Sequence, residues 1–311
     1  MELTGRTRIT VSDLRGDPRR TRTEKLVRYA LFAAAATSIV ISAAIVLSLA
    51  GETWTFVSQV ELASLWTDGW FPRRGMYDVK TIVAGSVLVS AVAMAVAVPL
   101  GLGAAIYLAE YASPRVRKVL KPTLEILAGI PSVVLGFFAL SFISPQIVQR
   151  FFTDATAFSM AAAGIGVGIL VVPLMATISE DALRSVPVAL REASTGIGAR
   201  KITTTVRVVI PAAVSGLVAA FIVAVSRAIG ETMVVFIAAG ATGGALFSLD
   251  VFGPGQTMTA AMASQAAGTD QVRGEALTFQ SLFFVGMLLF LFTFALNLSA
   301  DHFVRRVRQA Y

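Results

Sequence analysis

Five long stretches of the chain contain no Asp, Glu, Lys or Arg, and they limit what the chain can fold into. They are 23 to 29 residues long and cover residues 29–51, 81–109, 126–149, 155–179 and 276–300. A helix of about 20 apolar residues crosses the hydrocarbon layer of a membrane. The chain is 56 % hydrophobic and only 14 % charged, whereas soluble domains are about 25 % charged. We therefore expect an all-α, polytopic membrane protein.

A sixth span is expected between residues 207 and 250, where Arg227 and Glu231 are the only charged residues. These 42 residues as one helix would measure about 63 Å, roughly twice the hydrocarbon thickness. We expect one long helix over about 212–239, because the glycine cluster at 240–244 frees the backbone there. An external loop with a short helix then leads to the last span.

Positive charge is distributed unevenly over the segments that connect the spans. Alternate segments hold 20 lysines and arginines in one set and 5 in the other. Membrane proteins keep such an excess on the cytoplasmic side. The bias predicts an N-in, C-in topology in which segments 109–123 and 179–211 are cytoplasmic. It also accounts for the net charge of +7 without a nucleic-acid partner.

The expected organisation follows from these six spans. Its parts are a basic cytosolic tail (1–28), a first transmembrane helix (29–50), an external loop (51–80), a transmembrane domain (81–306) and a cytosolic C-terminus (307–311). Spans within the domain are expected at about 82–108, 124–143, 157–178, 212–239 and 277–299, with a cytosolic loop over 179–211. The first apolar run exceeds the roughly 7–15 residues of a signal-peptide core, so we expect it to remain as an anchor. The tail lacks apolar periodicity and is expected to touch anionic lipid.

Few side chains of this chain suit catalysis. It has no cysteine and a single histidine, His302, which leaves no thiolate and little for a metal site or a Ser-His pair. None of the lysines follows a glycine, so the Gly-Lys-Ser/Thr element of a phosphate-binding P-loop is absent. The run from Gly164 to Gly168 lacks the strand that precedes a nucleotide loop, and we expect it to serve helix packing. We therefore do not expect an enzyme.

Three prolines, Pro99, Pro131 and Pro173, fall inside expected spans. Each removes a backbone donor and frees a carbonyl, which is tolerated where another helix or a wet cavity satisfies it. Between Leu127 and Ser132 a glycine, a proline and a hydroxyl occur within two turns, as expected near a translocation path. A kink that only lets helices pack closely explains a single proline equally well.

Arg227 and Glu231 are the most informative pair in the sequence. They are four residues apart, so on a helix they share a face and can pair. Arg227 lies about 15 residues, or roughly 23 Å, into a helix that begins near residue 212. A charge within the hydrocarbon layer costs at least about 2.5–3.5 kcal/mol and by default marks a substrate path. We expect Arg227, Glu231, Thr232 and Ser132 to line such a path, for which an arginine fork favours an oxyanion. An ion pair that only locks two helices is the alternative.

The cytoplasmic segment from Pro187 to Pro211 is amphipathic and has the order helix, glycine, helix. Such an element on a cytoplasmic surface docks a partner protein, although many cytoplasmic loops are solvated amphipathic hairpins. Seven residues in it resemble the EAA loop of ABC importer permeases and keep its spacing: Glu192-Ala193-Ser194, Gly198, Val208 and Ile210-Pro211. Three of the seven depart from the family pattern, each by a small or conservative change.

The resemblance to ABC importer permeases implies a type I ABC permease fold. In that family the loop is a coupling helix that sits in a cleft of a cytosolic ATPase subunit and transmits its closure. The residues implied at this contact are Glu192, Ala193, Gly198 and Pro211.

Two further stretches, 125–134 and 227–233, resemble signatures of the permease subunits of the high-affinity phosphate importer. Features more similar to the PstC type than to the PstA type are the Trp- and Pro-containing outside loop, residues 178–183 and residues 257–259. The resemblance covers about 81–306. It implies that Arg227 and Glu231 line a phosphate path.

The resemblance also implies partners and a location. Such a permease works with a sister permease of the PstA type, two copies of a cytosolic ATPase subunit and an external phosphate-binding protein. It lies in the prokaryotic cell (inner) membrane. The chain itself binds no cofactor, because ATP and Mg²⁺ belong to the ATPase subunits. A glutamate one turn from the arginine would hold it until phosphate competes for it.

Three other functions remain open from the sequence. An ABC permease for sulfate, molybdate or phosphonate would use the arginine fork equally well. A secondary transporter needs intramembrane ion-coupling groups, and only Glu231 is clearly available. A purely structural anchor fits the spans but leaves the intramembrane charge unexplained.

Overall fold

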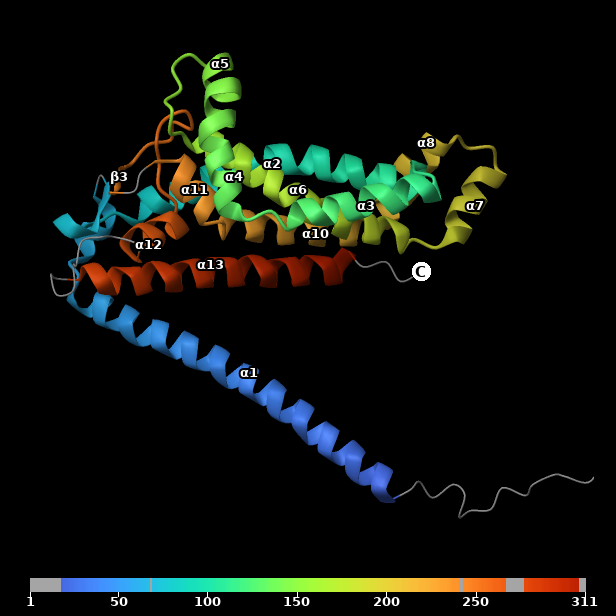
Figure 1. Ribbon diagram of the computed structural model, residues 1–311, viewed down its shortest axis with the longest axis horizontal. Coiled ribbons are helices and arrows are strands. Elements are labelled where there is room, and N and C mark those ends of the chain that lie inside the picture. Colours follow the sequence, from blue (N-terminus) through green and yellow to red (C-terminus); the bar gives the residue numbers. More distant parts are fainter. Residues whose placement is uncertain (1–17, 68, 241–242, 267–276, 308–311) are drawn as a thin grey trace, which may run out of the picture. The chain divides into compact units, whose positions relative to one another are not determined.

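The computed structural model describes residues 18–67, 69–240, 243–266 and 277–307. Within these residues, helices of α, 3-10 and π type (the last two marked η) dominate, with three short strands (Figure 1). The elements in chain order are α1 (Pro18–Gln59), η1 (Leu62–Trp66), β1 (Gly69–Phe71), η2 (Pro72–Arg74), β2 (Met76–Tyr77), α2 (Val79–Ile106), η3 (Tyr107–Tyr111), α3 (Pro114–Ala128), α4 (Ser132–Phe138), η4 (Ala139–Val148), α5 (Gln149–Phe151), α6 (Met160–Arg184), α7 (Val188–Gly196), α8 (Lys201–Thr204), η5 (Thr205–Val209), α9 (Ile210–Ala212), α10 (Val214–Ile229), α11 (Met233–Ala238), β3 (Ala245–Leu246), α12 (Met258–Ala266) and α13 (Thr278–Val307).

The number of spans agrees with the sequence-based expectation. In the described residues, five helices are long and apolar enough to cross a membrane: Arg22–Gln59, Val79–Tyr111, Ser132–Phe151, Met160–Arg184 and Thr278–Ala300. A sixth arises if Lys201–Ala212 and Val214–Ile229, which meet at a bend of 71°, form one span. The all-α membrane fold is therefore confirmed.

The first helix is longer than expected. The chain divides into two units, Met1–Gly51 and Glu52–Tyr311, and α1 begins in the first and ends in the second. It starts at Pro18 rather than near residue 29, because proline suits a first helical position and Arg, Glu, Lys and Leu after it are good helix formers. It ends at Gln59, so the first residues of the external loop expected over 51–80 are helical.

Two expected spans have different bounds in the structure. The helix expected over 124–143 is divided at Gly129–Pro131, since Pro131 cannot donate within a helix, and the apolar span runs instead over Ser132–Phe151. The helix expected over 212–239 is interrupted after Ile229, where Gly230 caps α10. Pro99 and Pro173, by contrast, remain inside the continuous helices α2 and α6.

Glycines of α6 allow close contact with helices on both of its sides, as expected from the sequence. A Cβ on Gly164 would lie 2.6 Å from Val92 Cβ of α2. A Cβ on Gly166 would lie 3.0 Å from Ala139 Cβ and from Val234 Cγ1 of α11. The distance at Gly164 is shorter than real Cβ contacts and the one at Gly166 is tighter than most of them, so the small residues of α6 serve packing.

The segments between spans at one end of the second unit form a small antiparallel sheet in the order β2-β1-β3. Trp70 pairs with Tyr77 on one side and with Ala245 on the other. The sheet thus joins segments that are far apart in the sequence. The short helix expected after the glycine cluster is α12.

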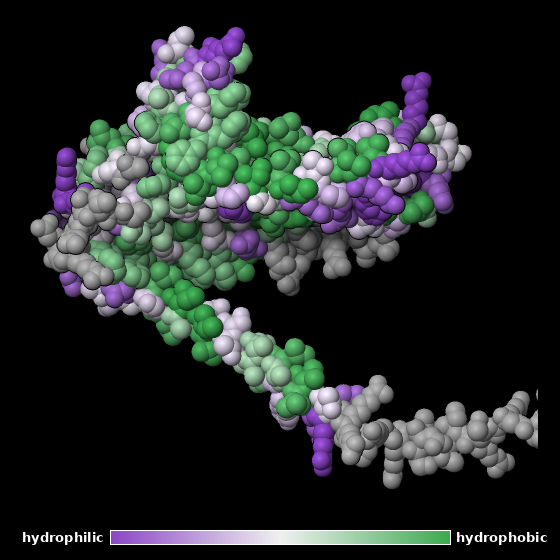
Figure 2. Space-filling view, viewed as in Figure 1, coloured by the Kyte–Doolittle hydropathy of each residue, from purple (hydrophilic) through white to green (hydrophobic). Residues whose placement is uncertain are grey.

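Apolar and charged surfaces are separated along the second unit. Figure 2 shows apolar side chains along the packed helices and hydrophilic ones gathered around α3 and α7. This separation fits the charge bias that places segments 109–123 and 179–211 in the cytoplasm.

Cysteine labelling of this cysteine-free chain tests the topology. The charge bias predicts that positions near Gly69 and Gly268 are external and those near Arg115 and Ala199 internal. Gly69 is buried, so exposed Ala63 is the better external position, and Gly268 lies outside the described residues. We expect an impermeant thiol reagent added to intact cells to label Ala63→Cys but not Ala199→Cys. Labelling at 199 from outside would refute the topology.

Candidate functional site

The charged pair predicted from the sequence forms at the break between α10 and α11. Arg227 occupies the last turn of α10, and its Nη1 lies 2.7 Å from Glu231 Oε2. Glu231 lies beyond the helix rather than on it, because Gly230 caps α10. The glutamate side chain is 3 % exposed and that of the arginine 45 %. The arginine therefore presents charge to its surroundings, while the buried carboxylate holds it in place.

Hydroxyl groups link this break to α12 and, through α12, to α2, and sequence reasoning missed them. Thr259 Oγ1 donates to the Glu231 carbonyl at 2.8 Å and lies 3.0 Å from Thr257 Oγ1. Ser86 Oγ of α2 accepts from the Met258 amide at 2.9 Å. The start of α12 is thus bonded both to α2 and to the broken span. The run Thr257-Met-Thr259 could have indicated these contacts, since two threonine hydroxyls in an apolar region need hydrogen-bond partners.

Ser132 and Thr232 each adjoin a break. Thr232 follows Glu231, and its Oγ1 donates to the Gly230 carbonyl at 3.4 Å. Ser132 is the first residue of α4 and half-buried. One turn further, a Cβ on Gly136 would lie 3.1 Å from the Met233 carbonyl of α11. The two helices that follow the breaks therefore pack together, although in the described part of the chain no hydrogen bond or ion pair joins Ser132 to the Arg227–Glu231 pair.

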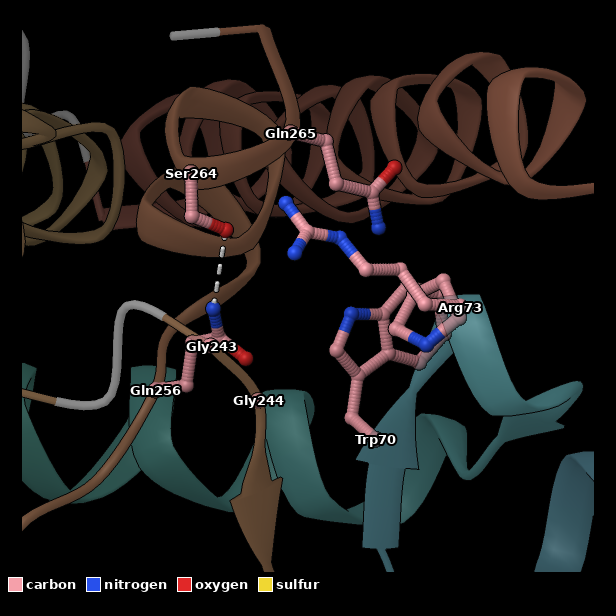
Figure 3. A pocket seen from close by; sticks show the side chains of 8 residues that line it. Trp70, Arg73, Gly243, Gly244, Gln256, Ser264 and Gln265 are labelled. Carbon is pink, nitrogen blue, oxygen red and sulfur yellow. Dashed lines mark hydrogen bonds between the residues drawn. The ribbon is translucent and has the colours of Figure 1, made fainter. Parts of the chain in front are cut away.

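A polar pocket lies beside the small sheet, on the side predicted to be external (Figure 3). It is lined by Trp70, Pro72, Arg73, Gly243, Gly244, Gln256, Ser264 and Gln265. Ser264 donates to the Ala261 carbonyl at 2.9 Å, so its Oγ accepts from Gln256 Nε2 at 3.1 Å. This orientation leaves Gln256 Oε1 buried and unpartnered in the described structure. Gln256 begins the segment whose Thr259 bonds to Glu231, which connects the pocket to the broken span.

The segment expected to be cytoplasmic has the predicted order of helix, glycine and helix. Glu192 and Ala193 are exposed on α7, and Gly198 follows with a φ of +83°, a conformation that favours glycine. The second helix runs through α8 and η5 to α9, which contains exposed Pro211. Ser194 is instead buried, with its Oγ 2.9 Å from Thr204 Oγ1 of α8. The four residues implied at the ATPase contact therefore lie on the open side of the segment.

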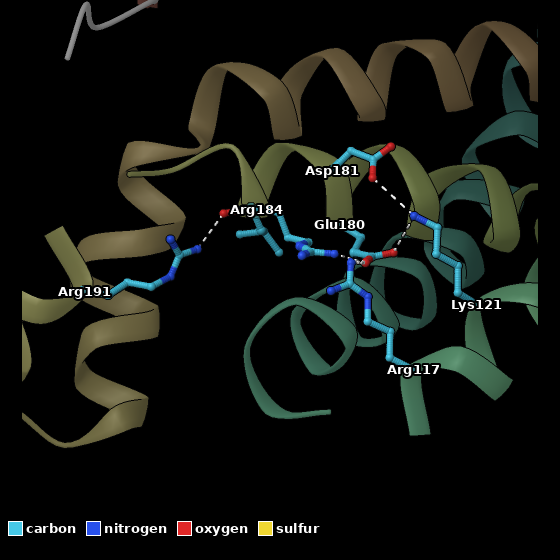
Figure 4. A network of polar contacts seen from close by, with 7 residues as sticks. Arg117, Lys121, Glu180, Asp181, Arg184 and Arg191 are labelled. Carbon is cyan, nitrogen blue, oxygen red and sulfur yellow. Dashed lines mark hydrogen bonds and ion pairs between the residues drawn. The ribbon is translucent and has the colours of Figure 1, made fainter. Parts of the chain in front are cut away.

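A charged cluster joins α3 to the end of α6 (Figure 4). Glu180 is fully buried and pairs with Arg117, while Lys121 Nζ lies 3.3 Å from Glu180 Oε2 and 3.4 Å from Asp181 Oδ1. Burial alone would lower the pKa of Lys121, but its bonds and attraction to these carboxylates outweigh burial and raise that pKa. A raised pKa keeps Lys121 charged. Its attraction to Glu180 and Asp181 therefore stabilises the fold fully at neutral pH, and this stabilisation is lost only as pH rises through the raised pKa.

Several apolar helices are long enough to cross a membrane, and one broken span carries a charged pair. These features fit a membrane transport subunit. The chain belongs to the family of binding-protein-dependent transport system inner membrane components, whose model matches residues 97–309. It is thus a multi-pass membrane protein and a transport subunit, not an enzyme.

Relatives and solved structures agree with this family. The chain is 30 % identical over 293 residues to the phosphate transport system permease protein PstC of Mesorhizobium japonicum, covering 88 % of each chain. It is 36 % identical over 185 residues to PstA 1 of Mycobacterium tuberculosis, covering 59 % of this chain and 58 % of that one. A chain of the MetNI methionine ABC transporter in an inward-facing conformation superposes with a TM-score of 0.53 at 18 % identity, covering 74 % of this chain and 94 % of that one. The type I ABC permease fold is confirmed, and the match to this PstC covers more of the chain than the match to this PstA.

Proposed function

We propose that the chain is the PstC-like permease subunit of an ATP-driven phosphate importer. The observation that carries the proposal is the Arg227–Glu231 pair: a half-exposed guanidinium, held by a buried carboxylate, at the break of a membrane helix. A dianion crossing a membrane needs a fixed cation, and a guanidinium matches an oxyanion in geometry as well as charge. The names of the relatives support phosphate as that anion.

The proposed complex contains further subunits. Membership of the family supports a permease partner and an ATPase-type assembly. We infer that a PstA-like sister permease completes the path, that two ATPase subunits with ATP and Mg²⁺ supply energy, and that an external phosphate-binding protein delivers the anion. Glu192, Ala193, Gly198 and Pro211 would contact an ATPase subunit, because they lie exposed on the cytoplasmic segment.

Anion uptake by the reconstituted complex tests the proposal. With the binding protein outside and ATP inside proteoliposomes, we expect labelled phosphate to accumulate, and an excess of sulfate or molybdate to leave its rate unchanged. Accumulation should stop without ATP and persist when ionophores dissipate proton and sodium gradients. Strong competition by sulfate or molybdate would instead assign the permease to another oxyanion, and dependence on an ion gradient would indicate a secondary transporter.

A further inference from the structure

A single arginine ties α7 to the ends of two membrane helices. Arg191 donates to Glu110 Oε1 from Nη2 at 2.8 Å and from Nε at 3.2 Å. The same guanidinium donates to the Val186 carbonyl at 2.6 Å and to the Leu183 carbonyl at 2.8 Å. Glu110 belongs to η3, which continues α2, and Leu183 belongs to α6. Figure 4 shows the Arg191 side chain extending from α7 toward the end of α6.

The position of this guanidinium at the ends of two helices explains why it makes several hydrogen bonds. The last carbonyls of a helix have no partner within it, and an arginine near the C-terminus can supply the missing donors. The Glu110 side chain is 8 % exposed and that of Arg191 22 %, so the ion pair is largely withdrawn from water. Hydrogen bonds between charged groups are roughly twice as strong as neutral ones.

A second contact between α7 and the membrane helices is apolar. Leu190 packs against a cluster of Ala105, Leu183 and Val186 with residues of the segment that leads to α10. Apolar contacts are non-directional, so they leave the orientation of α7 loosely defined. The planar fork of Arg191 is directional and fixes that orientation.

We propose that Arg191 is the positioning residue that transmits movement of α7 to α2 and α6. The inference rests on the proposed function, because it requires an ATPase subunit that moves α7. When α7 shifts, the guanidinium pulls on the end of α2 through Glu110 and on the end of α6 through the two carbonyls. Without it, α7 still docks the ATPase but moves without carrying these helices along.

The ratio of ATP hydrolysed to phosphate transported tests this role in reconstituted complexes. We expect Arg191→Ala to retain its bound ATPase, to lose at least about tenfold in phosphate uptake and to lose far less in hydrolysis, so that the ratio rises. Arg191→Lys keeps the charge but not the fork and should recover only part of the uptake. Arg115→Ala is the matched control: an exposed arginine on the same predicted side, with no ion pair among the described residues, whose removal should leave the ratio unchanged.

Three results would overturn the proposal. The first is a wild-type ratio and wild-type uptake in Arg191→Ala. The second is a loss of uptake in strict proportion to lost ATPase subunit, which would mean that Arg191 only builds the docking surface. The third is a wild-type complex that carries no phosphate, which would contradict the proposed function and this inference together. Uptake by the wild-type complex therefore separates a failure of the function from a failure of the Arg191 assignment.

Discussion

Replacing Arg227 by glutamine should abolish phosphate uptake in complexes that still assemble. Without the guanidinium, the anion would enter a low-dielectric region with no charge partner, at a cost of several kcal/mol. Since each 1.4 kcal/mol is a factor of ten, we expect a loss of at least about 100-fold. The measurement is the initial rate of uptake per assembled complex, with complexes counted by their bound ATPase.

The structure adds a necessary control to this variant. Arg227→Gln leaves the Glu231 carboxylate, 3 % exposed, without its cation, and an unpaired buried charge destabilises by about 3–5 kcal/mol. A double variant with Glu231→Gln removes that charge and should assemble normally, yet transport no phosphate. Glu231→Gln alone should be milder, because phosphate itself can neutralise the arginine. Full uptake by the well-assembled double variant would show that the Arg227–Glu231 pair only holds helices together.

Replacing Gly198 by valine should abolish uptake while the subunit remains in the membrane. Gly198 has a φ of +83°, and no atom lies within 4 Å of a Cβ built on it. Within this chain the effect therefore arises from the backbone, where a left-handed conformation costs other residues about 1–2 kcal/mol, and from the altered turn between α7 and α8. Uptake and membrane content of the variant are the quantities to compare.

Gly196 provides the matched control for that variant. It is two residues away, with equally open space around its Cβ and without a positive φ. Gly196→Val should therefore keep most of the uptake that Gly198→Val loses. Equal uptake by both variants at the wild-type rate would show that the turn at Gly198 does not couple the two subunits.

The charged pair was predictable because it depends on local spacing, but the break beside it was not. A lone glycine such as Gly230 is tolerated in many helices, and the helix ends here with help from Thr259, whose hydroxyl bonds to the Glu231 carbonyl from 28 residues away. Proline is equally ambiguous in sequence. Pro99 stays within a helix, whereas Pro131, close behind Gly129, separates two helices.

Local sequence patterns also did not predict the ion pairs between residues that are far apart in the sequence. Arg191 and Glu110 are 81 residues apart, and Arg117 and Glu180 are 63 apart. Each residue alone reads as an ordinary charge at the cytoplasmic end of a span. Only the packing of α2, α3 and α6 brings them together, and for α2 and α6 this packing involves apolar and small residues such as Val92 and Gly164.

Chemical modification at position 227 tests most directly whether phosphate passes this residue. The chain contains no cysteine, so Arg227→Cys places a single thiol there, to be examined in a complex whose other subunits lack reactive thiols. We predict that this variant is inactive, that a methanethiosulfonate reagent carrying an ammonium group restores part of the uptake, and that a sulfonate-bearing reagent does not. Phosphate, but not sulfate, should slow the modification. A modified thiol that recovers no uptake, and whose reaction rate phosphate leaves unchanged, would contradict the assignment of Arg227 to the path.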